Sequence, residues 1–291
     1  PDDIGRLHRL VTMRVQGNPE LTHLPFTIGG MKNLKYLEFD TENMVSPDPQ
    51  FQTDHATITA YLQTLSDSML SRSLDLSNRD LKAFPMDVLL LTGLTFLTIA
   101  RNKIKKLPDE MCHHLSNLRM LDLESNQIEA LPESIGFARN LTCICALGNN
   151  IAVLPNSLGL VHDHGMLLEL DPDKISTPPG EVFSRGTSQA LAYLRLLQDS
   201  VQTRTLSLSK WRLSSLPVEV TDLETLTELS ITFNKMKVLP AAVGKLSQLT
   251  RLKASDNNLV ALPPELAALT RLTDLDVSNN PLDSGFPPQA V

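Results

Sequence analysis

Two pairs of soft ligands are the residues best suited to chemistry in this sequence. Cys143-x-Cys145 and His162-x-His164 could supply thiolate sulfur and imidazole nitrogen, the donors that zinc prefers. Zinc needs four such donors converging about 2.0–2.3 Å from one point. The cysteines are expected to project from one strand, whereas His162 lies on the approach to the next. The sequence therefore predicts no metal site.

A second candidate is the run from Gly180 to Gly186, which is followed by Thr187 and Ser188. A phosphate-binding loop needs four residues between its glycines and a lysine after the second one, to cradle and neutralise phosphate. Here five residues intervene and the lysine is absent. Signatures of serine hydrolases, zinc proteases and paired catalytic carboxylates are also missing. The sequence predicts neither an enzyme nor a cofactor.

Composition narrows the class of protein further. The chain has 291 residues, of which 42% are hydrophobic and only 4% aromatic, so leucine supplies most of the core. Its net charge of −7 disfavours nucleic acid as the main partner, because phosphate binding needs a basic surface. No apolar run is long enough to span a membrane. Three cysteines, an odd number, favour a reducing compartment and predict a cytoplasmic location.

The elements that would position any site come from an internal repeat. LTFLTIARNKIKKLP (94–108), LRMLDLESNQIEALP (118–132) and LTELSITFNKMKVLP (226–240) share the pattern L-x-x-L-x-L-x-x-N-x-L-x-x-L-P. Eleven such turns can be placed, mostly 23 or 24 residues apart. An L-x-L alternation predicts a short strand with its leucines inward, and stacked copies bury a continuous core.

This pattern resembles the leucine-rich repeat family, in its intracellular Leu-Pro-containing subtype. The resemblance implies an α/β solenoid, a horseshoe with a parallel concave β-sheet and a mostly irregular or 3-10 convex side. It also implies that the repeated Asn lies inside each turn and satisfies buried backbone groups. Family members are protein-binding modules rather than enzymes.

The repeat is interrupted twice. Residues 47–70 and 176–200 resemble each other at an offset of 132, and both show apolar residues at helical spacing. We therefore predict two short inserted helices, at about 47–72 and 178–203, with Thr187 or Ser188 capping the second. Similar segments close repeat blocks in Roco-like proteins. The repeat blocks are 1–46, 73–177 and 204–291, all in one solenoid. Residues 280–291 resemble the start of a third interruption, and the chain begins within a repeat, as expected for a segment of a longer protein.

The predicted concave surface carries the most specific signal. Its variable positions in the second to seventh turns hold seven acids and one base, around a less polar path. This pattern predicts an interface with an apolar centre and a charged rim. The candidate partner-binding residues are Glu38, Asp40, Asp75, Phe96, Arg101, Met120, Asp122, Glu124, Cys143, Cys145, Leu147, Glu169 and Asp171. The alternative is that the acids keep an exposed sheet soluble.

The sequence thus favours a non-catalytic scaffold that binds other proteins, at least one with a basic segment. Two alternatives stay open. The chain could be the regulatory arm of a larger signalling enzyme of the Roco type, or a structural subunit of a large ciliary or ribosomal assembly. None of the three requires a cofactor, nucleic acid or a membrane span.

Overall fold

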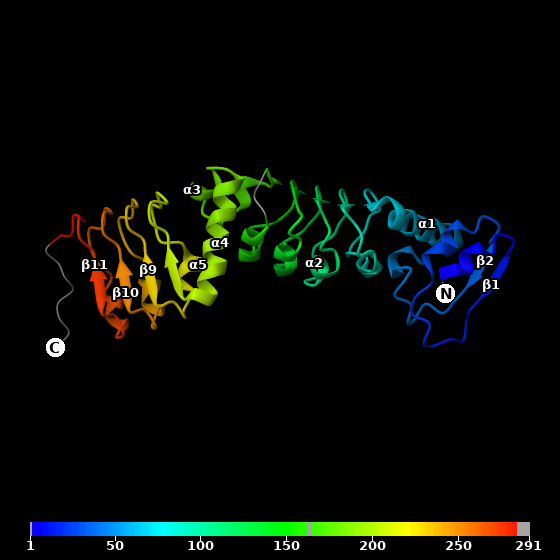
Figure 1. Ribbon diagram of the computed structural model, residues 1–291, viewed down its shortest axis with the longest axis horizontal. Coiled ribbons are helices and arrows are strands. Elements are labelled where there is room, and N and C mark those ends of the chain that lie inside the picture. The colour runs from blue at the N-terminus through cyan, green and yellow to red at the C-terminus, as the bar shows by residue number, and fades with distance from the viewer. Residues whose placement is uncertain (1, 162–164, 284–291) are drawn as a thin grey trace. The chain divides into compact units, whose positions relative to one another are not determined.

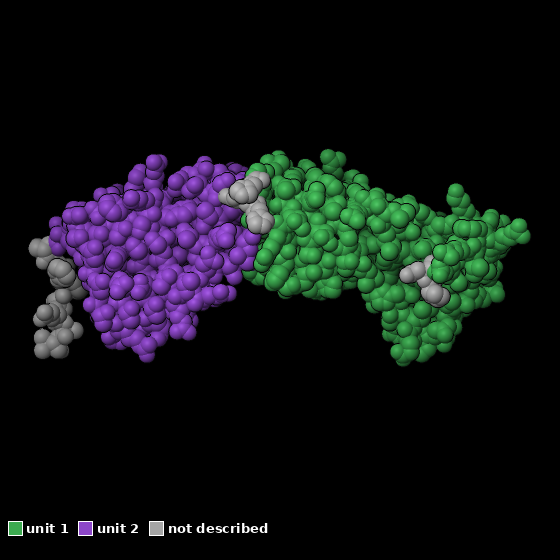
Figure 2. All heavy atoms as spheres, in the orientation of Figure 1, with its two compact units in different colours: residues 1–151, 161–171 green, residues 152–160, 172–291 purple. Residues whose placement is uncertain are grey.

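A computed structural model describes residues 2–161 and 165–283 of the chain. His162, His164 and residues 284–291, which include most of the predicted third interruption, lie outside the described residues. The chain divides into two compact units, drawn in different colours in Figure 2. Unit 1 comprises residues 1–151 and 161–171, and unit 2 comprises residues 152–160 and 172–291.

Unit 1 is built from parallel three-residue strands, one in each turn of the chain (Figure 1). A two-stranded sheet pairs β1 (Thr12–Arg14) with β2 (Tyr36–Glu38). A separate five-stranded sheet follows in chain order, made of β3 (Ser73–Asp75), β4 (Phe96–Thr98), β5 (Met120–Asp122), β6 (Cys143–Cys145) and β7 (Leu167–Glu169). The break between the two sheets coincides with the first interruption of the repeat.

Unit 2 repeats this plan with a four-stranded parallel sheet. Its strands, again in chain order, are β8 (Thr205–Ser207), β9 (Glu228–Ser230), β10 (Arg251–Lys253) and β11 (Asp274–Asp276). The middle residue of each strand from β8 to β10 is a buried leucine, as the L-x-L alternation predicts. Because every turn adds its leucines to those of its neighbours, the core runs through each unit as a continuous column.

Between the strands, the turns contain mainly 3-10 helices and single α-helical turns, most of which begin directly after a proline. Proline has a fixed φ near −65° and lacks an N–H, so it fits the residue that precedes a helix. In unit 1 these are η1 (Asp2–Arg6), η2 (Phe26–Gly30), η3 (Pro49–Phe51), η4 (Met86–Leu90) and η5 (Glu133–Phe137), with the single-turn α2 (Met111–His114). In unit 2 they are η6 (Asn156–Leu160), η7 (Pro172–Lys174), η8 (Ala241–Lys245) and η9 (Pro264–Ala268), with the single turns α3 (Gly180–Phe183) and α5 (Val218–Thr221).

The repeated asparagines form a ladder of side-chain hydrogen bonds inside the turns. Asn126 donates to the carbonyls of Leu123 and Ile99 over 3.1 and 2.9 Å, and accepts from the amide of Ile104 over 3.1 Å. Asn102, Asn149, Asn234, Asn257 and Asn280 make equivalent bonds. Buried backbone groups between turns are thereby paired, as the resemblance implied.

Both interruptions form the predicted helices, and the solenoid fold with two inserted helices is confirmed. They are α1 (His55–Ser71) in unit 1 and α4 (Thr187–Thr203) in unit 2, and each packs on the 3-10 helix of the preceding turn, η2 or η6. Glycine permits this approach. A Cβ on Gly29 would lie 2.0 Å from the amide nitrogen of Gln63, and one on Gly159 would lie 2.2 Å from that of Arg195.

The capping prediction for the second helix was wrong. Gly186 precedes α4 with φ +102° and no side chain caps the helix, so neither Thr187 nor Ser188 has that role. In the first copy Asp54 occupies this place, and its carboxylate accepts from the amide of Thr57 over 2.9 Å. The two helices therefore start by different means, because glycine offers backbone freedom where aspartate offers a cap.

Candidate functional site

The sheet face of unit 1 is the predicted concave surface in its five-stranded part. We use this name for the outward side chains of β3 to β7 and of the residues that follow each strand. Strand register aligns them in two rows. The first row is Ser73, Phe96, Met120, Cys143 and Leu167, and the second is Asp75, Thr98, Asp122, Cys145 and Glu169. The predicted candidates in these turns do share one face.

The first row is mostly apolar and open to solvent. Phe96 is 45% exposed and Leu167 49%, with the half-buried Met120 and Cys143 between them in register. Leu147, which follows β6, is exposed as well. Side chains of this size on neighbouring parallel strands lie about 4.8 Å apart, close enough to form one apolar strip. The predicted apolar path is therefore a continuous surface.

The acidic candidates border this strip, and several carboxylates are held by backbone amides. Asp75 accepts from the amide of Ser77 over 2.8 Å, and Asp122 accepts from the amide of Glu124 over 3.0 Å. Asp122 also accepts from the hydroxyl of Thr98 over 2.9 Å. These bonds fix the positions of the two carboxylates, and among residues 2–161 and 165–283 neither Asp75 nor Asp122 forms an ion pair with Lys or Arg. Asp171 accepts from the amide of Gly148 in the same manner, over 3.0 Å.

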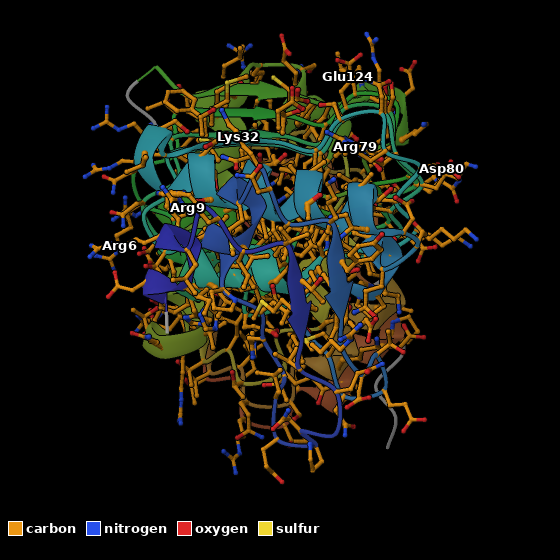
Figure 3. All side chains as sticks on the ribbon, turned by 90° about the vertical axis from the view of Figure 1, so that its right-hand side faces the viewer. Arg6, Arg9, Lys32, Arg79, Asp80 and Glu124 are labelled. Carbon is orange, nitrogen blue, oxygen red and sulfur yellow. The ribbon has the colours of Figure 1, made fainter. Side chains whose placement is uncertain are left out.

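Arg101 and Glu124 follow adjacent strands. The amide of Arg101 donates to the carbonyl of Glu124 over 2.7 Å, and the Arg101 side chain is exposed. Figure 3, a view from the end of unit 1 that carries the N-terminus, shows Arg79 and Asp80 on one side of the unit and Arg6 and Arg9 on the other. Glu124 is labelled at the upper edge of the same view.

Cys143 and Cys145 meet on the sheet face as free thiols. Their sulfur atoms are 3.5 Å apart, and both side chains are half-buried. Burial raises the pKa of the Cys145 thiol, and the hydrogen bonds of this thiol to Cys143 and Glu169 raise it further. A thiol that stays protonated is a poor nucleophile, so Cys145 is not an activated cysteine. Burial likewise raises the pKa of Cys112, to about 12.

The structure does not bring all the candidates together. Glu38 and Asp40 belong to the two-stranded sheet at β2, on the other side of the break caused by α1. Glu38 is also neutralised, because Arg14 on β1 lies 3.0 Å from it. Asp40 accepts from the amide of Gly17 over 2.6 Å. Arg14 belongs to the first turn, whereas the candidate residues were taken from the second to the seventh turns. The sequence-based list therefore did not include this ion pair.

Two exposed apolar residues on these sheets were also missed. Leu167 extends the apolar row of the sheet face by one strand, beside Cys143. Tyr36 occupies the corresponding place on β2 and is 60% exposed. Leu167 and Tyr36 stand at the same position of the repeat as Phe96 and Met120. That shared position could have identified them in the sequence as exposed residues of the sheets.

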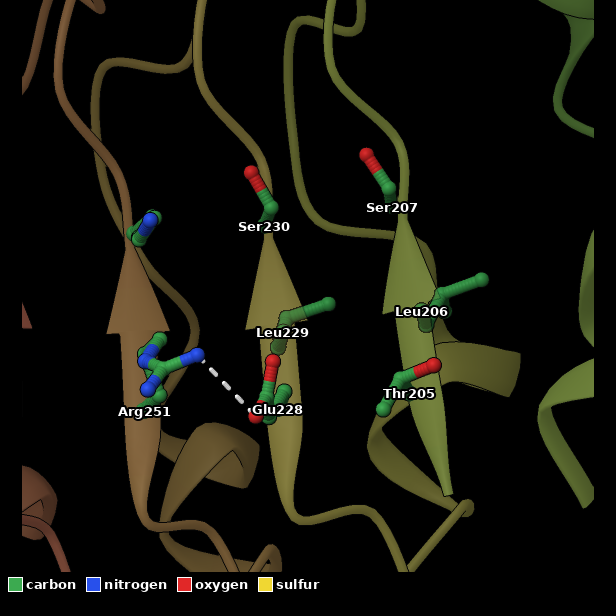
Figure 4. Close-up of a pocket in the computed structure, with 8 residues that line it drawn as sticks. Thr205, Leu206, Ser207, Glu228, Leu229, Ser230 and Arg251 are labelled. Carbon is green, nitrogen blue, oxygen red and sulfur yellow. Dashed lines mark ion pairs between the residues drawn. The ribbon is translucent and has the colours of Figure 1, made fainter. Parts of the chain in front are cut away.

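The sheet of unit 2 has a different chemistry. Arg251 on β10 lies 3.0 Å from Glu228 on β9 and 3.2 Å from Asp274 on β11, so both acids are paired with a cation. Figure 4 shows the pocket on this sheet, in which the Arg251–Glu228 ion pair lies. The hydroxyl-bearing side chains of Thr205, Ser207 and Ser230 also line it. The acidic and apolar character is therefore a property of unit 1.

Metal binding finds no support in the part of the chain that the structure describes. Residues 2–161 and 165–283 contain no group of three or more His, Cys, Asp or Glu side chains that could hold an ion. The predicted absence of a Cys–His zinc quartet also concerns His162 and His164, which lie outside the described residues. Within the described residues, no helix is long and apolar enough to cross a membrane.

Comparison with family models gives two matches. Residues 183–285 match a leucine-rich repeat region, and residues 72–128 match a leucine-rich repeat. Together these matches cover more than half of the chain. A search of curated proteins finds no match.

Solved structures with a similar fold come from several organisms. A leucine-rich repeat protein of Leptospira interrogans is 22% identical with a TM-score of 0.32, over 98% of this chain and 88% of that one. An internalin of Listeria monocytogenes is 19% identical with a TM-score of 0.35, over 97% and 72%. The plant peptide hormone receptor RGFR1, solved in complex with RGF2, is 19% identical with a TM-score of 0.34. The match covers 96% of this chain but 38% of the receptor.

The family follows from the repeats themselves and from the way they fold. Consecutive turns place parallel strands side by side, and an asparagine ladder closes the turns from within. With these features and the two repeat matches, the chain belongs to the leucine-rich repeat family.

Proposed function

We propose that this chain is a non-catalytic scaffold that binds another protein on the sheet face of unit 1. Leucine-rich repeats generally mediate protein–protein interaction. The observation that carries the proposal is the exposed apolar row of Phe96, Met120, Cys143 and Leu167, bordered by carboxylates. An apolar centre with a charged rim is the usual composition of a protein interface.

The partner segment should be basic. Asp75, Asp122 and Glu169 stand in one row of the sheet, on β3, β5 and β7, and Glu124 and Asp171 follow two of these strands. Arg101 opposes them with a single positive charge. Because aligned charges of one sign add their potentials, the row favours Lys and Arg and accelerates their association at low salt.

The length of the partner segment can be estimated from the strand spacing. Five strands about 4.8 Å apart span ~19 Å, which an extended segment covers with about six residues at ~3.3 Å each. A segment that crosses the strands would place apolar side chains on the Phe96–Leu167 row and basic ones over the Asp75–Glu169 row. We therefore expect a partner sequence in which apolar and basic residues mix over this length.

We further propose that the repeats are of the intracellular Leu-Pro subtype and that the scaffold acts in signalling in the cytoplasm. The three cysteines, all free thiols, support a reducing compartment. The same sheet face would serve a regulatory arm of a Roco-like enzyme or a subunit of a large assembly equally well. These alternatives differ in what else is attached to the chain and not in how unit 1 binds.

A charge-reversal capture experiment tests the proposal. The immobilised 291-residue chain and its Asp122→Lys/Glu124→Lys variant capture proteins from a cell extract, which mass spectrometry identifies. A Glu129→Lys/Glu133→Lys variant is the matched control, since it changes the same net charge in unit 1 on exposed residues outside the sheet face. We expect basic partners to be lost only from the first variant. Equal capture by all three proteins would reject the sheet face as the binding site.

A further inference from the structure

A second candidate surface of unit 1 is a groove beside the inserted helix, outside the sheet face. Three depressions adjoin one another there. The first is lined by Phe26, Met69 and Leu90, the second shares Met69 and Leu90 with it, and the third shares Gly93 with the second. The third also contains Arg72 and Arg119. We call this connected surface the helix groove; it leads from an apolar end to a basic end.

Large apolar side chains are exposed in and beside the apolar end, in which Met69 and Leu90 line two of the depressions. Met69 and Leu70, at the end of α1, are 59% and 88% exposed, and Leu90 at the end of η4 is 51% exposed. Met86, at the start of η4, is exposed as well. Clustered apolar residues that line a depression are typical of binding sites, whereas scattered ones are normal on any surface.

The sibling copy in unit 2 shows that this apolar character is not needed to seat the helix. The same positions of the repeat hold Asn156 for Phe26, Gln202 for Leu70 and Asp222 for Leu90. Asp222 forms an ion pair with Lys245 over 3.1 Å. Helix α4 still packs on η6 as α1 packs on η2. Val201 and Val218, which correspond to Met69 and Met86, are exposed apolar residues as well. Phe26, Leu70 and Leu90 are therefore the positions at which unit 1 alone is apolar, and these three are not required to seat the helix.

The basic end specifies the kind of ligand. Arg72 and Arg119 are exposed, and within the described residues neither guanidinium has an ion-pair partner. Two unpaired guanidinium groups at one end of an apolar groove complement carboxylates that follow apolar side chains. We infer that the helix groove binds a partner protein through a short segment in which two or more apolar residues adjoin Asp or Glu.

A protein segment fits this surface better than a lipid bilayer does. The apolar residues line depressions, into which the side chains of a peptide can insert. A helix that binds a membrane surface usually carries Lys and Arg along its polar face, whereas α1 (His55–Ser71) contains neither. The inference is independent of the function proposed for the sheet face, because the two surfaces share no residue and attract opposite charges.

Selection from a random peptide library tests the helix groove on the whole chain. Displayed 15-residue peptides are selected against the 291-residue protein, and the affinity of selected peptides is measured by fluorescence anisotropy. The variants are Leu90→Asp and Phe26→Asn, which introduce the residues of the sibling copy, and Arg72→Glu/Arg119→Glu. Asp222→Leu is the matched control in unit 2. Vesicles with and without anionic phospholipid form a separate arm, and thermal unfolding checks that each variant is folded.

We expect to select peptides that combine apolar residues with Asp or Glu. These peptides should bind Leu90→Asp at least about tenfold more weakly than the parent, because a central apolar contact is lost. The Arg72→Glu/Arg119→Glu variant should bind these peptides more weakly by a similar factor, and its affinity for them should no longer depend on salt. Asp222→Leu should bind as the parent does. Peptides that lose affinity in Leu90→Asp but contain no acidic residue would overturn the inference. So would a selection in which no peptide loses affinity in Leu90→Asp or Phe26→Asn, or binding to anionic vesicles that Leu90→Asp abolishes.

Discussion

The hydroxyl of Tyr193 on α4 donates a hydrogen bond of 2.8 Å to Glu219, in the turn that follows the helix. Tyr61 on α1 donates to Asp87 in the same way, and the two bonded residues stand 26 positions apart in both pairs. Each inserted helix is thereby tied to the next repeat through a buried tyrosine and a largely buried acid. The recurrence shows that the helices are built into the solenoid.

Replacing Tyr193 by Phe should destabilise unit 2. The change leaves the largely buried Glu219 carboxylate without this donor, which costs about 1–3 kcal/mol of unfolding free energy. Urea denaturation followed by circular dichroism measures the effect. Tyr36→Phe, which removes an exposed hydroxyl in unit 1, is the control and should leave the midpoint unchanged. Equal midpoints for both variants would contradict the structural role of the Tyr193 bond.

Asp87 should make the stability of unit 1 depend on pH. Burial raises the pKa of this carboxyl to about 6 and the charge of Asp48 adds to the rise, although the bond from Tyr61 opposes it. Since the folded pKa lies above the ordinary 3.8, protonation favours the folded state. The contribution is therefore present below about pH 4 and is lost as the pH rises through 6.

The expected size of this effect is ~3 kcal/mol of unfolding free energy between pH 4 and pH 7, as an order of magnitude for a shift of about two pKa units. Urea titrations at several pH values compare the parent with Asp87→Asn, which cannot ionise at this position. The parent should lose more stability than the variant over this range. Parallel pH profiles would show that Asp87 is not the group responsible.

The glycine under each inserted helix should not tolerate a side chain. In Gly159→Ala the new Cβ would lie 2.2 Å from the backbone nitrogen of Arg195, so α4 must move away. Overpacking of this kind costs about 1–3 kcal/mol and more where backbone is involved. Gly93→Ala is the control, because a Cβ there meets nothing within 4 Å. Thermal unfolding of the two variants checks the difference, and a stable Gly159→Ala protein would disprove the close packing.

Asn126 should be far more important for stability than an asparagine on the surface. Asn126→Ala leaves the carbonyl of Ile99 and the amide of Ile104 without partners inside the turn, each at about 1–3 kcal/mol. Asn117→Ala removes a single exposed bond, to the carbonyl of Thr92. We expect a large drop in the urea midpoint for the first variant and a small one for the second. A comparable drop in both would argue against the interior ladder.

The sequence was sufficient to predict the features that depend on local periodicity. The L-x-L pattern located strands such as β4 and β5, and the offset of 132 residues located α1 and α4. The same periodicity placed Phe96, Met120 and Cys143 in one row of the sheet. Each of these features follows from residue spacing alone, because every turn contacts mainly its neighbours.

Features that depend on packing across an interruption could not be predicted in this way. The pattern did not show that the sheet breaks after β2, which separates Glu38 and Asp40 from the other acids. Trp211 stands at an asparagine position, yet it packs edge-on against Tyr193 at 5.7 Å, a contact that depends on how the helix is seated. Such contacts join residues that no repeat pattern relates.

The salt dependence of partner binding tests the central claim most directly. A basic partner captured by the chain is titrated against the parent, Asp122→Lys/Glu124→Lys and the Glu129→Lys/Glu133→Lys control, at about 50 and 200 mM salt. We predict that the parent and the control lose affinity as salt rises. The sheet-face variant should bind about tenfold more weakly at low salt and show little salt dependence. An unchanged affinity with an unchanged salt dependence in the Asp122/Glu124 variant would contradict the account.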